Sequence, residues 1–103
     1  MQKFNTDAYG EILYVNFNED ISTGTAFTLE LDPQEGNSID KTPTLGTSDV
    51  DVGDQTYLAN QYVKWTTTSD VFQNYIGLWR AKATATLPTK TLATDFILFR
   101  VTA

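Results

Sequence analysis

Residues 78–88 read LWRAKATATLP, and every second side chain from Trp79 to Leu87 is apolar, while basic residues and threonines stand between them. Successive side chains of a β-strand point to opposite faces of a sheet, so this alternation predicts a long strand with one buried face. The apolar positions at its centre are all small: Ala81, Ala83 and Ala85. The stretch therefore predicts a sheet protein whose longest strand has an inner face of small residues.

The same period of two recurs outward from this strand. In AFTLELD, residues 26–32, the apolar side chains of Phe27, Leu29 and Leu31 share one face. Similar alternation predicts three further strands, in EILYVNF (11–17), YVKWTTT (62–68) and DFILFRV (95–101). A weaker strand, SIDKTPTLG (38–46), contains Pro43, which favours a sheet edge because proline lacks a backbone donor.

Segments rich in Gly, Pro, Asn and Asp separate these strands and predict turns. Only SDVFQNY, residues 69–75, has a pattern that supports a short helical turn, with Ser69 as a candidate N-cap. Six or seven short strands at this spacing predict an all-β fold, an antiparallel β-sandwich.

A chain of 103 residues has the length of one domain. We expect a single sandwich over residues 11–103, preceded by an N-terminal arm over residues 1–10. The arm contains two isolated aromatic residues, Phe4 and Tyr9. It is either a frayed terminus or a segment whose aromatic side chains dock on a neighbouring molecule.

The chain contains no cysteine and no histidine. This excludes disulfides, thiolate metal sites, cysteine nucleophiles and histidine bases. Four glutamates offer carboxylates, but their scattered positions specify no acid–base pair: Glu11, Glu19, Glu30 and Glu35. We therefore expect a protein that is not an enzyme and that needs no cofactor.

Charge is distributed unevenly along the chain. Residues 1–60 carry two lysines and eleven acidic residues, whereas residues 61–103 carry five basic and two acidic residues. This asymmetry is either an incidental difference between two sheet faces or loop ends, or it marks complementary faces that steer subunits together. No basic run suits nucleic acid and no apolar run approaches the length of a membrane span, so we expect neither partner.

The stretch SDVDVGDQTY, residues 48–57, contains Asp49, Asp51 and Asp54. Calcium prefers several carboxylate oxygens on a flexible loop, but the spacing here departs from the calcium loop of EF-hand proteins at three positions. The preferred interpretation is an acidic connection between strands that recognises a neighbouring subunit electrostatically, and a calcium site is the lesser alternative. Candidate interface residues are then Phe4, Tyr9, Asp49, Asp51, Asp54 and Tyr57.

Aromatic residues could also stack on sugars. Trp65 and Trp79 lie in phase with apolar neighbours, which favours a role in the core. Three tyrosines would be exposed stacking groups if the protein bound carbohydrate: Tyr57, Tyr62 and Tyr75.

Four segments together resemble the small immunoglobulin-like domains of virion proteins of tailed bacteriophages. They are DISTGTAFTLEL (20–31), KTPTLGTSDVDVG (41–53), QTYLANQYVKWTTTSD (55–70) and GLWRAKATAT (77–86). Matching positions are Asp20-Ile21-Ser22, Phe27-Thr28-Leu29, Leu45-Gly46, Tyr62-Val63, and Gly77 with Trp79.

The resemblance covers about residues 10–102 and implies an immunoglobulin-like sandwich of about seven strands with no catalytic residues. It implies a small, noncatalytic virion subunit that attaches to the head, neck or tail and mediates assembly or decoration. Its partners would be capsid, neck or tail subunits and copies of itself, through loops, edge strands or the last strand, residues 95–103. The alternative is a sandwich module that binds carbohydrate or the host surface.

Overall fold

The computed structural model describes residues 2–68, 71–72 and 75–103, and this part of the chain contains eleven β-strands and no helix. The strands are β1 (Gln2–Asn5), β2 (Ile12–Asn16), β3 (Ala26–Pro33), β4 (Ile39–Lys41), β5 (Thr44–Leu45), β6 (Val50–Val52), β7 (Gln55–Tyr57), β8 (Tyr62–Thr66), β9 (Gly77–Thr86), β10 (Thr91–Ala93) and β11 (Ile97–Thr102). The predicted all-β sandwich is confirmed. The strand count exceeds seven because short strands at edges and in hairpins add to the main ones.

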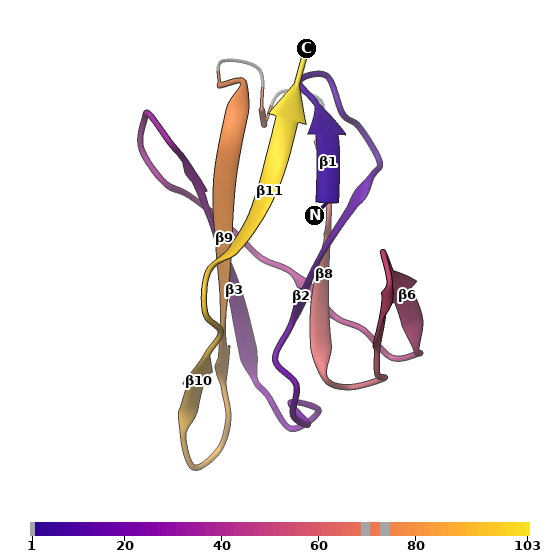
Figure 1. Cartoon of the computed structure of the whole chain (residues 1–103). Helices are drawn as coiled ribbons and strands as arrows, with labels where there is room; N and C mark the ends of the chain where they lie inside the picture. The colour runs from indigo at the N-terminus through magenta and orange to yellow at the C-terminus, as the bar shows by residue number, and fades with distance from the viewer. Residues whose placement is uncertain (1, 69–70, 73–74) are drawn as a thin grey trace.

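Six strands form the large sheet, in the order β1-β11-β9-β3-β4, with β10 also paired to β9. All of its pairs are antiparallel except β1 with β11, which run parallel with Gln2 opposite Phe99. Figure 1 shows β9 as the long central strand of this sheet on the left, with β11 and then β1 to its right. Part of the expected N-terminal arm is therefore a strand of the sandwich itself.

Three strands form the small sheet, in the order β2-β8-β5. The chain crosses from the large sheet to the small one between β4 and β5, where Pro43 is buried. Both of these short strands lie at sheet edges, as the proline predicted.

The core lies between the sheets and follows the predicted alternation. Trp65 and Trp79 are both buried, which confirms their assignment to the core. At one end, four rings pack together with centroid separations of 5.2–5.8 Å: Phe4, Phe72, Trp79 and Phe99. Phe72 is fully buried although no alternation marks it, and Ser69, the candidate N-cap before it, lies outside the described residues.

The alanine face of β9 lines the core between the two sheets. Ala81, Ala83 and Ala85 have no exposed surface, and Cα atoms of β2 and β9 approach within 8 Å. Packed sheets are usually about 10 Å apart, so small side chains on β9 allow this contact.

Enlarging the central alanine should therefore destabilise the sandwich. For Ala83→Leu we expect a loss of about 1–3 kcal/mol in the free energy of unfolding, because the added carbons have no space. Chemical denaturation measures the loss. Thr84→Leu, on the opposite face of the same strand, is the control and should change stability by less than about 1 kcal/mol. Equal losses in both variants would contradict the packing constraint.

Candidate protein-binding surfaces

The acidic stretch forms a β-hairpin of its own rather than a plain connection. Strands β6 and β7 pair with Val52 opposite Gln55, which leaves Gly53 and Asp54 as a two-residue turn. Gly53 has a φ of 64°, and a glycine with positive φ at the first turn position is typical of a type II′ hairpin. We call residues 48–57 the acidic hairpin. It lies on the right of Figure 1, on the side of the small sheet.

Two of its three aspartates accept local hydrogen bonds. Asp49 Oδ1 accepts a hydrogen bond from the N–H of Ala59 at 2.8 Å, and Asp51 Oδ1 accepts one from the hydroxyl of Thr56 at 2.7 Å. Asp54 is exposed at the turn. Among the described residues, no three acidic side chains gather into a group that could hold a metal ion, so these aspartates do not converge.

Three tyrosines fix the acidic hairpin to the outer face of the small sheet. The rings of Tyr14, Tyr57 and Tyr62 lie 6.0–6.4 Å apart between centroids, and the Tyr62 hydroxyl donates to the carbonyl of Ser48 at 2.7 Å. Tyr62 lies directly over Gly46, where a Cβ would overlap its ring. The expected exposed roles of Tyr57 and Tyr62 are therefore wrong, because both rings are buried in this cluster.

Two shallow grooves run between the acidic hairpin and the edges of the sheets. One has a volume of about 450 Å³ and the other about 280 Å³, and both include Gln2, Val52 and Gly53 in their walls. The side-chain amide of Gln2 bridges the sheets here: it donates to the carbonyl of Tyr14 at 2.9 Å and accepts from its N–H at 3.0 Å. This pairing occupies backbone groups of β2 that a foreign strand would otherwise use.

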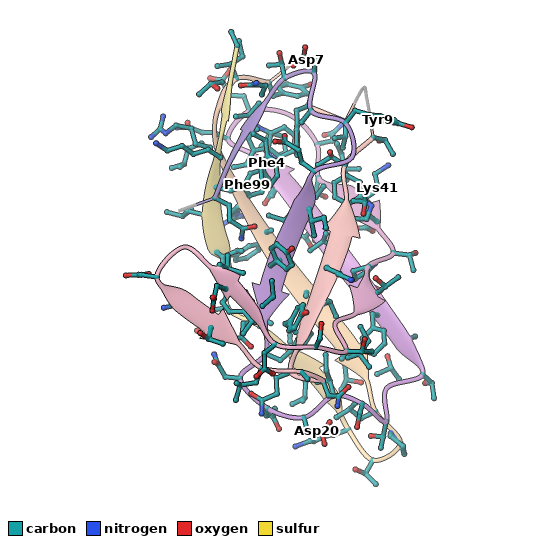
Figure 2. The ribbon with its side chains drawn as sticks, turned by 90° about the vertical axis from the view of Figure 1, so that its right-hand side faces the viewer. Phe4, Asp7, Tyr9, Asp20, Lys41 and Phe99 are labelled. Atoms are coloured by element: carbon teal, nitrogen blue, oxygen red, sulfur yellow. The ribbon has the colours of Figure 1, made fainter. Side chains whose placement is uncertain are left out.

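The two aromatic residues of the expected arm differ in position. Phe4 is 6% exposed and packs against Phe72 and Phe99, so its expected role as an interface anchor is wrong. Tyr9 is 76% exposed in the loop after β1. Figure 2 shows Phe4 beside Phe99 within the sandwich and Tyr9 at its periphery.

The last strand is not an exposed edge. We expected residues 95–103 to pair across a subunit boundary, but β11 lies between β1 and β9 and pairs with both. That prediction is wrong, because the short parallel strand β1 occupies its outer side.

The outer face of the large sheet is a surface that the sequence analysis did not identify as a site. Arg80 lies with its Cζ atom 4.1 Å from the ring centroid of Phe96 and with its Nε 2.8 Å from Asp32 Oδ2. The Nζ of Lys82 lies 5.5 Å from the same ring, and Leu98 is half exposed nearby. The sequence does contain a signal for this surface. In DFILFRV, the apolar residues Phe96 and Leu98 occupy the positions that alternate with the buried ones, where polar residues are expected.

Groups for acid–base chemistry are dispersed. Glu11 precedes β2, Glu30 lies in β3 and Glu35 lies in the turn after it, while Glu19 pairs with Lys90 at 3.5 Å between loops. The part of the chain that the structure describes contains no helix with the length and apolar character of a membrane span.

No protein-family model matches the sequence, and no curated protein matches it. A proposed function must therefore rest on the surfaces that this chain presents. Two stand out: the acidic hairpin with its grooves, and the outer face of the large sheet.

The contact between Gly46 and Tyr62 predicts a coupled pair of substitutions. Gly46→Ala should displace the Tyr62 ring, loosen the acidic hairpin and lower the free energy of unfolding by about 1–3 kcal/mol. In a Tyr62→Ala background the same change should cost much less, because the obstructing ring is absent. Denaturant unfolding of the four proteins gives the coupling energy, and amide exchange of the acidic hairpin reports its release. Purely additive losses would contradict this packing.

Alkaline pH should release the acidic hairpin. Burial raises the pKa of the Tyr57 phenol above its ordinary value of 10.0, so the folded state favours the neutral ring. The resulting stability is complete below pH 10 and is lost as the pH rises through the higher folded pKa. Ultraviolet titration should show a late tyrosine that is missing in Tyr57→Phe. If that variant kept the late component, the assignment to Tyr57 would fail.

Proposed function

We propose that this chain is a noncatalytic structural subunit of a tailed-bacteriophage virion, with an immunoglobulin-like sandwich that binds other proteins at the head, neck or tail. The strand order supports the immunoglobulin-like type. In that fold one sheet contains strands C, F and G and the other contains B, E and D. In the large sheet, β3, β9 and β11 neighbour one another and would correspond to C, F and G. In the small sheet, β2, β8 and β5 would correspond to B, E and D.

Physical roles of the residues that carry the resemblance also support the proposal. Hydrogen bonds from the hydroxyl and the backbone N–H of Ser22 hold the pKa of Asp20 below its ordinary value of 3.8, and Ile21 between them is fully buried. Gly46 accommodates the Tyr62 ring, and Gly77 has a φ of 125° at the start of β9, a conformation that favours glycine. These positions shape the sandwich.

Other features depart from antibody domains. The chain has no cysteine, and its aromatic cluster lies where Trp79 on β9 meets Phe72, Phe4 and Phe99. The acidic hairpin is inserted between β5 and β8. An insertion fixed to the sandwich by buried tyrosines is a feature of this chain that suits recognition.

The observation that carries the proposal is this rigid attachment. Binding is favoured when a recognition element is ordered before contact, because less conformational entropy is lost. The acidic hairpin holds three aspartates and no basic residue, so it suits a basic surface on another virion protein. Complementary charge of this kind mainly raises the rate at which two proteins associate and fixes how they align.

The carbohydrate-binding alternative receives less support. Its proposed stacking residues Tyr57 and Tyr62 are buried, as are Trp65 and Trp79. Tyr75 keeps 38% of its surface exposed, and its carbonyl accepts a hydrogen bond from Trp79 Nε1 at 2.9 Å. A single half-exposed ring does not form a stacking platform.

A binding experiment tests the assembly role. Purified protein is added to isolated phage particles and to their head, neck and tail proteins, and bound protein is measured at low and high salt. We expect Asp54→Lys at the tip of the acidic hairpin to weaken binding about tenfold at low salt, and less at high salt. Glu35→Lys, the same charge reversal in the turn after β3, is the control and should bind normally.

Two outcomes would count against the proposal. Equal loss in both variants would indicate a general charge effect rather than recognition by the acidic hairpin. Binding to oligosaccharides with none to any virion protein would favour the carbohydrate-binding module.

A further inference from the structure

One of the two grooves beside the acidic hairpin combines apolar walls with groups that accept hydrogen bonds. It has a volume of about 280 Å³ and lies between the turn of the acidic hairpin and the start of β11, where Ile97 and Leu98 form apolar walls. Its polar side chains are one carboxylate, one phenol and two amides: Asp54, Tyr57, Gln2 and Gln55. None of the described residues in its walls is basic. We call it the hairpin groove.

The hydroxyl of Tyr57 is directed toward this groove. The residue is only 8% exposed, because its ring packs against Tyr14 and Tyr62. The Tyr62 hydroxyl donates to the carbonyl of Ser48, whereas the Tyr57 hydroxyl makes no hydrogen bond with any described residue. Yet no fully buried side-chain oxygen or nitrogen in this part of the chain lacks a partner. The Tyr57 hydroxyl therefore reaches solvent, through the groove that Tyr57 lines.

These groups suit a cation that carries several N–H donors on an apolar stem. Asp54 supplies negative charge, and burial raises the pKa of the Tyr57 phenol, so the phenol stays neutral near neutral pH and can accept a hydrogen bond. Arginine presents five N–H donors in a planar fork, whereas lysine is a compact point charge. Long basic side chains also lay their stems along apolar surface, and Leu98 leaves 49% of its surface exposed here. The net charge of −6 attracts a basic partner.

We propose that the hairpin groove binds an arginine side chain of a partner protein, with the guanidinium between Asp54 and the Tyr57 hydroxyl and the stem against Leu98. The inference rests on the proposed function and deepens it, because the partner then presents an arginine that projects from its surface rather than only a basic field. The binding surface also spans both sheets. Leu98 belongs to the large sheet, and the acidic hairpin packs on the small one.

Titration of the full chain with short peptides, followed by NMR of the backbone amides, tests the groove. The probes are acetylated and amidated pentapeptides with glycine at four positions and arginine, lysine or citrulline, the neutral analogue of arginine, at the centre. We expect the arginine peptide to shift the signals of residues 52–57 and 97–98 and to saturate in the millimolar range, because one side chain makes few contacts. The lysine peptide should bind at least about threefold more weakly. The citrulline peptide should not saturate.

Two nearly isosteric variants test the assigned contacts. Tyr57→Phe removes only the hydroxyl and Asp54→Asn removes only the charge, and each should weaken binding of the arginine peptide at least about threefold. Tyr14→Phe removes a hydroxyl from the same ring cluster outside this groove, and Glu35→Gln removes a charge from the turn after β3. Both controls should bind as the unaltered chain does. Thermal unfolding should give similar midpoints for all four variants.

Two results would overturn the proposal. One is the absence of saturable shifts at residues 52–57 and 97–98 up to about 20 mM arginine peptide. The other is binding that is equal for the arginine and lysine peptides and unchanged in Tyr57→Phe, because charge alone would then explain it. Should Tyr57→Phe unfold, Asp54→Asn at the exposed turn and the comparison of the three peptides still decide the question.

The hairpin groove and the assembly role can fail separately. Arginine binding in the groove without binding to any virion protein would support the groove and count against the virion role. A virion protein whose binding is weakened by Asp54→Lys but not by Tyr57→Phe would leave the assembly role intact and overturn the groove.

Discussion

The close approach of β9 to β2 is the constraint on which the rest of the sandwich depends. Small alanine side chains on the inner face of β9 leave room for β2 to approach, and the four-ring cluster around Phe72 fills the space at one end. No disulfide joins the sheets, because the chain has no cysteine. Side-chain size along one strand therefore sets the separation of the sheets, and the N-terminal strand completes the core by inserting Phe4.

A second cluster connects this scaffold to the acidic hairpin. Tyr14 and Tyr62 project from the outer face of the small sheet, and Tyr57 of the acidic hairpin packs against them. Gly46 provides the space that Tyr62 occupies. The position of the three aspartates thus depends on aromatic packing and on one glycine, while their charges stay at the surface. Because tyrosines make the packing contacts, the aspartates of the acidic hairpin can keep their charges in water.

The two candidate surfaces belong to different sheets and meet at one groove, which Asp54 of the acidic hairpin and Leu98 of the large sheet both line. The acidic hairpin packs against Tyr14 and Tyr62 of the small sheet, and the outer face of the large sheet carries Arg80 and Lys82 beside Phe96. At the edge between them, Gln2 pairs with the backbone of Tyr14, and β1 covers the outer side of β11. Assembly would then use side-chain surfaces more than added strands.

Alternation along the sequence determined the fold class and the inward faces, including Trp79, Leu29 and Phe99, because a strand has only two sides. The three aspartates of residues 48–57 marked the acidic stretch as the most distinctive segment. Only the tertiary structure decided that Phe4 and Tyr57 are buried and that β11 has a neighbouring strand on both sides. Periodicity tells which side of a strand a residue occupies, but not which strand lies beside it. The hairpin groove is lined by β1, the acidic hairpin and β11, which are distant in sequence, so no single segment contains it.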